Sequence, residues 1–340
     1  GAGFLEIETP ILIKSTPEGA RDHVVPSRLY PGTFYALPQS PQQLKQLLMV
    51  GGIEKYFQIA RCFRDEDSRA DRQPEFTQLD LEMSFVEQED ILQLTEELFT
   101  GLISDLFPDK TIMKPFPRLT HEEAMRDYAI DRPDLRFDLK MADLAPIAKS
   151  VEFNVFQNVL DSGGIVKGFA APGCSDYTRG QIDELTDFVR ARGANGLIAI
   201  GISGRGDSAD DLDMSEVKSN ILRFLSEEHV KGFAEKTGAQ NGDLVLMIAG
   251  EENQTNQALG ALRHEMGGRL KLGDPNEMAF ALITDFPLFE WNHDEDRWDA
   301  SHHAFCMPKD GYIQYMESDP SKVIAQSYDL ICNGIEMASG

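Results

Sequence analysis

The chain has 340 residues, of which 57 are Asp or Glu and 32 are Lys or Arg, so its formal net charge at pH 7 is -25. A negative surplus of this size excludes a protein that coats nucleic acid through a general basic field, although it leaves room for a local basic patch. No apolar run in the sequence approaches the roughly 20 residues that cross a bilayer, so no membrane role is expected. The first residues carry acids instead of the basic and apolar segments of a secretory signal, which predicts a cytoplasmic protein.

The length exceeds the usual size of a single hydrophobic core, so we expect two domains, or one domain with a large insertion. The composition, 41% hydrophobic and 26% charged, is typical of a globular protein. The cysteines stand far apart and form no C-x-x-C pair, which predicts reduced, structural thiols. They are Cys62, Cys174, Cys306 and Cys332.

Residues 1 to about 115 are predicted to form strands and loops around one amphipathic helix. This helix is expected within 39–52, QSPQQLKQLLMVGG, where leucines recur at helical spacing before a Gly-Gly stop. A second helix is predicted at 87–107, because acids occupy its first turn, where the helix dipole favours negative charge.

Two alternating segments between these helices, 56–64 and 75–85, are predicted to form an antiparallel hairpin joined by the charged loop 65–74. Side chains alternate between the two faces of a strand, so the second segment presents one apolar and one polar face. The apolar face, which we expect to contact a core, consists of Thr77, Leu79, Leu81, Met83 and Phe85. The polar face consists of Phe76, Gln78, Asp80, Glu82 and Ser84.

From about 136 to 274 the pattern changes to a compact mixture of helices and strands that could bury a core of its own. Strands are predicted at 151–156, 163–171, 196–203 and 242–250, and helices at 179–193 and 253–270. Strands return within 278–291 and 328–337. The fold class is therefore predicted to be α+β, with a mostly antiparallel sheet interrupted by this insertion.

The polar strand face is the strongest functional signal. Antiparallel sheets often have one solvated face, and that reading stays open. However, this face combines an aromatic ring, an amide and two carboxylates, with arginines close by. The combination suits a nucleotide, because a ring can stack on a base, arginine forks onto phosphate, and carboxylates bind an ammonium or magnesium ion.

Several motifs resemble one enzyme family. FRDED, a variable loop and RQPEFTQLDLE (63–82) resemble the second signature motif of class II aminoacyl-tRNA synthetases, and GFLEIETPIL (3–12) resembles the end of the first. TPEGARD (16–22) and ALPQSPQQLKQLLM (36–49) are similar to the aspartyl-tRNA synthetases in particular, as is RADRQPEFTQLDLE. The resemblance spans nearly the whole chain. It implies a catalytic core at 1–135 and 275–340, interrupted at 136–274 by the insertion domain of bacterial-type members.

The resemblance also implies a nucleotide site. Arg64 would hold the α-phosphate, Glu66 would face the nucleotide from the same loop, and Arg72 would reach the distal phosphates. These three residues would be the catalytic ones, while Phe76 would stack on adenine. The remaining residues that the resemblance places at ATP are His302, His303 and Glu336.

An amino-acid site is implied in the same way. Glu18 resembles the carboxylate that faces the substrate ammonium, and Lys45 the partner of the substrate's side-chain carboxylate. The residues expected to orient the rest of the substrate are Gln42, Gln78, Asp80 and His302. Asp329 and Glu336 resemble the family's magnesium-binding carboxylates, although Asp329 could also be a polar residue at the end of a strand.

The implied activity is ATP-dependent formation of aspartyl-adenylate, followed by transfer of aspartate to the 3′ end of a tRNA. ATP and magnesium are then required, aspartate and tRNA are the substrates, and the full-length protein is expected to be a homodimer. One alternative is a sister synthetase for asparagine or lysine, against which Lys45 argues because it favours an anionic side chain. Another is a synthetase-like binding module without catalysis.

The chain departs from the family pattern at both ends. The sequence stops at NGIEMASG, before the family's glycine-rich segment and third motif, and it lacks the anticodon-binding domain. A truncated protein of weak or absent activity is therefore expected.

Overall fold

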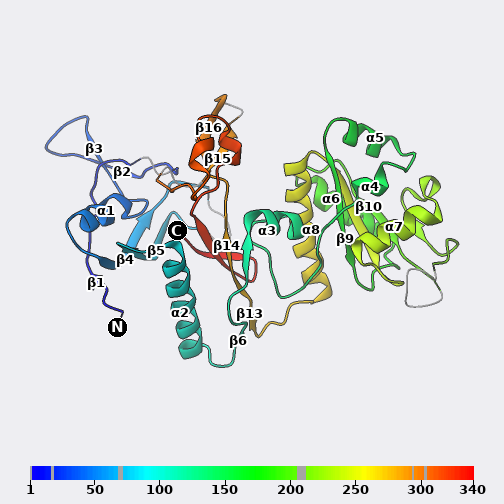
Figure 1. The fold of residues 1–340 in the computed structure, drawn as a ribbon, viewed down its shortest axis with the longest axis horizontal. Helices are drawn as coiled ribbons and strands as arrows, with labels where there is room; N and C mark the ends of the chain where they lie inside the picture. Colours follow the sequence, from blue (N-terminus) through cyan, green and yellow to red (C-terminus); the bar gives the residue numbers. More distant parts are fainter. Residues whose placement is uncertain (1, 17–18, 68–71, 205–211, 293–294, 302–304) are drawn as a thin grey trace. The chain divides into compact units, whose positions relative to one another are not determined.

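The computed structural model of the chain describes residues 2–16, 19–67, 72–204, 212–292, 295–301 and 305–340 (Figure 1). The chain divides into two compact units, 1–95 with 300–305, and 96–299 with 306–340. This division does not follow the boundaries at 136 and 274 expected from the sequence, which stay a prediction. In the parts of the chain that the structure describes, no helix is both long enough and apolar enough to cross a membrane.

The first unit is built on a three-stranded sheet in the order β1-β4-β5. Strand β4 (Lys55–Phe63) pairs antiparallel with β5 (Glu75–Met83) over nine residue pairs, and β1 (Leu5–Glu6) pairs parallel with β4. This confirms the predicted hairpin. Helix α1 (Gln42–Val50) confirms the first predicted helix, and β2 (Val24–Pro26) pairs with β3 (Phe34–Ala36) in a separate ribbon.

The face of the hairpin that is buried is the opposite of the one predicted. Ile59 and Leu79, on the apolar face, are 58% and 48% exposed, and Phe85 is 94% exposed. On the polar face, Tyr56 is fully buried and Gln58 is only 8% exposed. The prediction that the apolar face contacts a core is therefore wrong for the described chain, because α1 covers the polar face of the hairpin instead.

The second unit contains a four-stranded sheet in the order β18-β17-β14-β7. Its strands are β7 (Arg118–Thr120), β14 (Phe280–Thr284), β17 (Tyr328–Cys332) and β18 (Ile335–Ser339). Helix α2 (Gln88–Leu106) contributes Phe99 to the second unit, where Phe99 and Phe116 pack on Phe280. Helix α3 (His121–Tyr128) starts at a capping box formed by Thr120 and Glu123. The shorter strands are β6 (Thr111–Ile112), β13 (Glu277–Met278), β15 (Phe289–Asn292) and β16 (Arg297–Ala300).

The block predicted as an insertion contains a five-stranded antiparallel sheet in the order β11-β10-β12-β9-β8, with helices on both faces (Figure 1). Its strands are β8 (Ala142–Asp143), β9 (Ile165–Ala171), β10 (Ile198–Gly201), β11 (Lys218–Ser219) and β12 (Leu244–Gly250). Its helices are α4 (Ala145–Ala148), α5 (Asn154–Asp161), α6 (Arg179–Arg190), α7 (Glu227–Thr237) and α8 (Glu252–Leu270).

Strand β12 shows why this block buries a large core. Its seven residues are all buried, and they alternate between two hydrophobic clusters. Val245 and Met247 contact the cluster of α4, α5 and α7, whereas Leu246 and Ile248 contact that of α6 and α8. A strand with both faces covered needs apolar residues throughout, and for that reason it appears in the sequence as a continuous apolar run.

One predicted strand in this block is wrong. Residues 151–156 were expected to be extended, but α5 begins at Asn154. The reason is that Phe156, Val159 and Leu160 are spaced three and four residues apart, which places them on one helix face against the α4–α7 cluster. The mixture of helices and antiparallel strands nevertheless confirms the predicted α+β class.

Candidate active site

A buried ion-pair cluster connects α1 to the hairpin. The Lys45 ammonium lies 2.8 Å from Oδ1 of Asp80 and 3.4 Å from Oε2 of Glu82. The Lys45 and Asp80 side chains are only 11% and 10% exposed. Lys45 is the residue of α1 that is buried, whereas Leu44 and Leu48 are half-buried and Leu47 is exposed. Sequence reasoning omitted Glu82 from the site, although the residue belongs to the same alternating polar face.

The cluster has capacity for a further cation. Oδ2 of Asp80 is buried and has no hydrogen-bond partner among the described residues. Moreover, one ammonium here faces two carboxylates. A buried carboxylate oxygen without a partner is costly, so a ligand that donates hydrogen bonds to it, such as an ammonium group, would be stabilised.

A hydrogen-bond network supports the cluster on strand β4. The Tyr56 hydroxyl donates to Oε1 of Gln58 at 2.8 Å, and the Thr9 hydroxyl donates to the same oxygen at 3.0 Å. Burial, and then the negative charge of Asp80, raise the pKa of Tyr56, so its hydroxyl stays protonated and remains a donor. The Cys62 thiol donates to Oε1 of Gln78 at 3.2 Å and so orients that amide. Gln42, at the start of α1, is held by a bond from its backbone N–H to the Ser40 hydroxyl at 3.3 Å.

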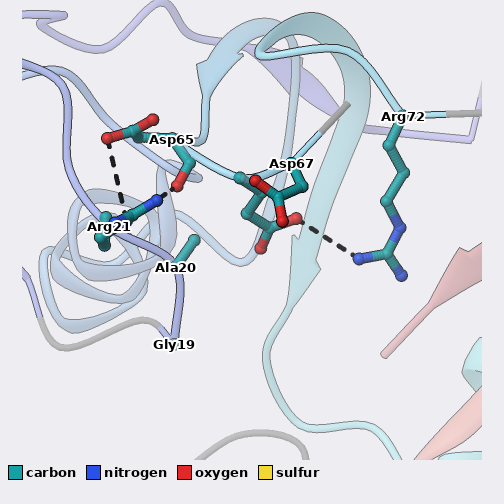
Figure 2. A pocket seen from close by; sticks show the side chains of 7 residues that line it. Gly19, Ala20, Arg21, Asp65, Asp67 and Arg72 are labelled. Carbon is teal, nitrogen blue, oxygen red and sulfur yellow. Dashed lines mark hydrogen bonds and ion pairs between the residues drawn. The ribbon is translucent and has the colours of Figure 1, made fainter. Parts of the chain in front are cut away.

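A pocket of about 380 Å³ lies beside the loop that joins β4 to β5 (Figure 2). It is lined by Gly19, Ala20, Arg21, Asp65, Glu66, Asp67 and Arg72. The structure thus brings together the predicted residues Glu66 and Arg72, whose side chains are 3.4 Å apart. Arg64 is not among the residues lining this pocket; its guanidinium carbon lies 5.1 Å from the centre of the Phe76 ring.

The two predicted magnesium ligands lie in the second unit on adjacent strands, Asp329 on β17 and Glu336 on β18. Burial, followed by the negative charges of Glu336 and Asp131, raises the pKa of Asp329 to about 7. A carboxyl group whose ionisation is opposed by a neighbouring carboxylate fits a divalent cation, and magnesium in nucleotide sites typically takes one or two protein carboxylates together with phosphates. The described residues contain no cluster of three or more side chains that could hold a metal ion.

Three predicted site residues, Glu18, His302 and His303, lie outside the described residues. The sequence reasoning also missed Arg21, Gln39 and Tyr56. Arg21 lies in TPEGARD, and Gln39 is the first residue of QSPQ. Both therefore lie in motifs that the sequence analysis identified, but there the functional roles were given to neighbouring residues of the same motifs.

Comparison with known proteins agrees with these motifs. Residues 1–340 match the family model described as tRNA synthetases class II (D, K and N). The chain belongs to this family. The predicted class II synthetase core is therefore confirmed, and its α+β elements are those described above.

The relatives carry more specific names. The aspartate--tRNA(Asp/Asn) ligase of Dehalococcoides mccartyi (strain CBDB1) is 52% identical over 338 residues, covering 99% of this chain and 56% of the relative. The aspartate--tRNA(Asp/Asn) ligase of Rubrobacter xylanophilus is 49% identical over 337 residues, covering 99% of this chain and 54% of the relative. The aspartate--tRNA ligase of Clostridium novyi (strain NT) is 49% identical over 339 residues, covering 99% of this chain and 55% of the relative. The chain thus spans little more than half the length of the curated relatives that it matches.

Proposed function

We propose that this class II synthetase chain belongs to an aspartate–tRNA ligase, in which it forms the pocket for aspartate and part of the pocket for ATP. The observation that carries the proposal is the Lys45–Asp80 pair, with its unpartnered buried oxygen. Aspartate carries an ammonium and a side-chain carboxylate. The ammonium would bind Asp80, and the side-chain carboxylate would bind Lys45. The names of the relatives support the same substrate.

The proposed chemistry needs positioning more than acid–base catalysis. An oxygen of the aspartate α-carboxylate attacks the α-phosphorus of ATP, the new O–P bond forms, and pyrophosphate leaves with the electrons of the broken bond. The carboxylate is already ionised at pH 7, so no strong general base is required. Arg64 and Arg72 would neutralise the charge that develops on the phosphates, while Glu66 and Phe76 would hold the nucleotide.

Asp329 and Glu336 would hold the magnesium ion that the family uses with ATP. When bound, this ion neutralises phosphate charge. Glu18, Gln42, Gln78 and His302 remain proposed aspartate-binding residues, and His303 a proposed ATP-binding residue. We further propose a tRNA substrate, a homodimeric full-length protein and a cytoplasmic location.

A second question is whether the full-length enzyme charges tRNA(Asp) alone or both tRNA(Asp) and tRNA(Asn). Some relatives are named for tRNA(Asp/Asn) and others for aspartate alone. The more similar of the relatives described above carries the broader name, and this favours an enzyme that charges both tRNAs. Aminoacylation of purified tRNA(Asp) and tRNA(Asn) by the full-length gene product distinguishes the two possibilities.

The amino-acid specificity is tested by ATP/pyrophosphate exchange with the full-length gene product, using aspartate, asparagine and lysine in parallel. We expect exchange with aspartate only. Lys45→Met should raise KM for aspartate about a hundredfold, because the bound side-chain carboxylate would lose the Lys45 ammonium. Lys236→Met, on the exposed face of α7, is the matched control and should change nothing. Equal exchange with asparagine would refute the assignment, and no exchange with any amino acid would favour a non-catalytic binding module.

A further inference from the structure

Arg21 is placed to bind an anion, although none of the motif assignments gives it that role. Its side chain is 78% exposed and lines the same pocket as Arg72 and Glu66 (Figure 2). Its contacts to Asp65 are long, 3.4 Å from Nε to the carbonyl oxygen and 3.9 Å from Nε to the carboxylate. Among the described residues the guanidinium is therefore held loosely, and these two contacts leave most of its donors available to a ligand.

The backbone at Arg21, in contrast, is fixed. The N–H of Asp65 donates to the carbonyl oxygen of Arg21 at 3.0 Å, and the two residues form an isolated antiparallel bridge. This bridge connects the segment at 19–22 to the loop that carries Glu66. A side chain on a fixed backbone loses less conformational entropy when it binds a ligand, so the fixed backbone at Arg21 favours binding.

Gln39 fixes the neighbouring peptide. Its side chain is only 1% exposed, and it accepts from the N–H of Ala20 at 3.2 Å while donating to the carbonyl oxygen of Ala20 at 2.8 Å. The second hydrogen of the same amide goes to Asp22 at 2.6 Å, and Asp22 also accepts from the Ser15 hydroxyl. Both donors and the acceptor of a buried amide are thus used to hold the residues on either side of Arg21.

We propose that Arg21 is a second phosphate-binding arginine of this pocket, that it contacts the polyphosphate of ATP, and that Gln39 is the residue that positions it. The inference rests on the proposed function and extends it. Figure 2 shows Arg21 beside Asp65 on one side of the pocket and Arg72 on the other, with Asp67 between the two arginines. Arginine forks onto phosphate oxygens, so two arginines that line one pocket suit a polyphosphate chain.

Titration of Mg·ATP into the full-length gene product, with calorimetric detection, tests this directly and requires no amino-acid activation. Arg21→Ala should raise Kd for Mg·ATP about tenfold, as expected for losing a charged hydrogen bond at an exposed site. It should raise KM for ATP similarly in the exchange assay and leave KM for aspartate unchanged. The matched control is Arg61→Ala, because Arg61 pairs with Glu75 at 3.1 Å and is 54% exposed on the same hairpin.

The positioning role of Gln39 is tested by a double-mutant cycle. Gln39→Met removes the amide at similar length and should weaken Mg·ATP binding, whereas in the Arg21→Ala background it should have no further effect. A purely structural role would lower affinity equally in both backgrounds, and this result would overturn the positioning role.

The outcomes separate the inference from the proposed function. Unchanged Mg·ATP affinity in Arg21→Ala, or no Mg·ATP binding by the wild type, would overturn the inference. A variant that raises KM for tRNA alone would assign Arg21 to RNA and would overturn it as well. Exchange that fails with aspartate while Mg·ATP still binds through Arg21 would refute only the proposed function.

Discussion

Replacing Lys45 by methionine tests the buried cluster as an element of stability. The substitution keeps the length of the side chain and removes its charge. Asp80, 10% exposed and 2.8 Å from the lost ammonium, would then be a buried carboxylate without a counter-charge, next to Glu82. Breaking a buried ion pair by removing one partner costs roughly 3 to 5 kcal/mol. Protection of the surrounding backbone should therefore fall by about two to four powers of ten.

Hydrogen exchange followed by mass spectrometry is the suitable assay, because both tryptophans, Trp291 and Trp298, lie outside β4 and β5, and their fluorescence would report on another part of the chain. Peptides from β4 and β5 should exchange faster in Lys45→Met. Peptides from β12, whose residues are all buried in the second unit, serve as the internal control and should not change.

A second variant shows whether the cause is the unpaired charge. Adding Asp80→Asn to Lys45→Met removes the uncompensated carboxylate, and most of the lost protection should return. If Lys45→Met leaves the protection of β4 and β5 within threefold of the wild type, Asp80 does not depend on Lys45, and the reasoning is refuted. If the double variant is as unstable as the single one, packing of the lysine stem is the cause and the charge is not.

Three further predictions concern the phosphate contact, the insertion block and pH. Arg64→Ala should lower the exchange rate far more than it changes KM for aspartate, and a variant with normal adenylation would contradict the proposed phosphate contact. Gly168→Ala places a methyl group 2.3 Å from the carbonyl oxygen of Leu246 and should lower the unfolding free energy by about 1 to 3 kcal/mol or more, measured by urea unfolding. Gly180→Ala meets nothing within 4 Å on α6 and should be neutral or stabilising by up to about 1 kcal/mol, which makes it the matched control. Burial opposes ionisation of Asp134, but the Arg136 guanidinium outweighs it and lowers the pKa of that carboxyl. The stability that Asp134 contributes is then present above the ordinary pKa of Asp, about 4, and is lost as the pH falls. Asp134→Asn should accordingly be less stable than the wild type at pH 7 and approach it in acid, whereas a constant difference would refute the ionic explanation.

Much of the first unit follows from local sequence. The strict alternation from Glu75 to Met83 predicts a strand, and the charged loop before it predicts a hairpin; both are found. The helix that carries Lys45 is marked by the spacing of its leucines and its Gly-Gly end. These features depend on side chains a few residues apart, so the sequence alone contains them.

The burial of the hairpin could not be predicted in this way. Whether the face with Leu79 or the face with Asp80 is covered depends on which element packs there, and α1 comes from another part of the chain. An apolar strand face predicts a core contact only when an apolar partner is available to it. Here the lysine of α1 meets two carboxylates, and electrostatic pairing determines the contact.

The burial of Arg263, in the second unit, also could not be predicted from the local sequence. The sequence predicts its helix, α8, but an arginine is normally placed on a helix surface. In the structure Arg263 is 1% exposed and donates to four backbone carbonyl groups. They belong to Asp134, Phe137, Asp138 and Leu139. Burial lowers the pKa of its guanidinium to about 10.

The sequence by itself therefore determined most of the local elements and the family. Only the tertiary structure determined which side chains are buried, that Glu82 joins Lys45, and that Gln39 holds the peptide before Arg21. The physical reason is that strand and helix periodicity arises from neighbouring residues, whereas burial and ion pairing arise from residues that the sequence separates by tens or hundreds of positions.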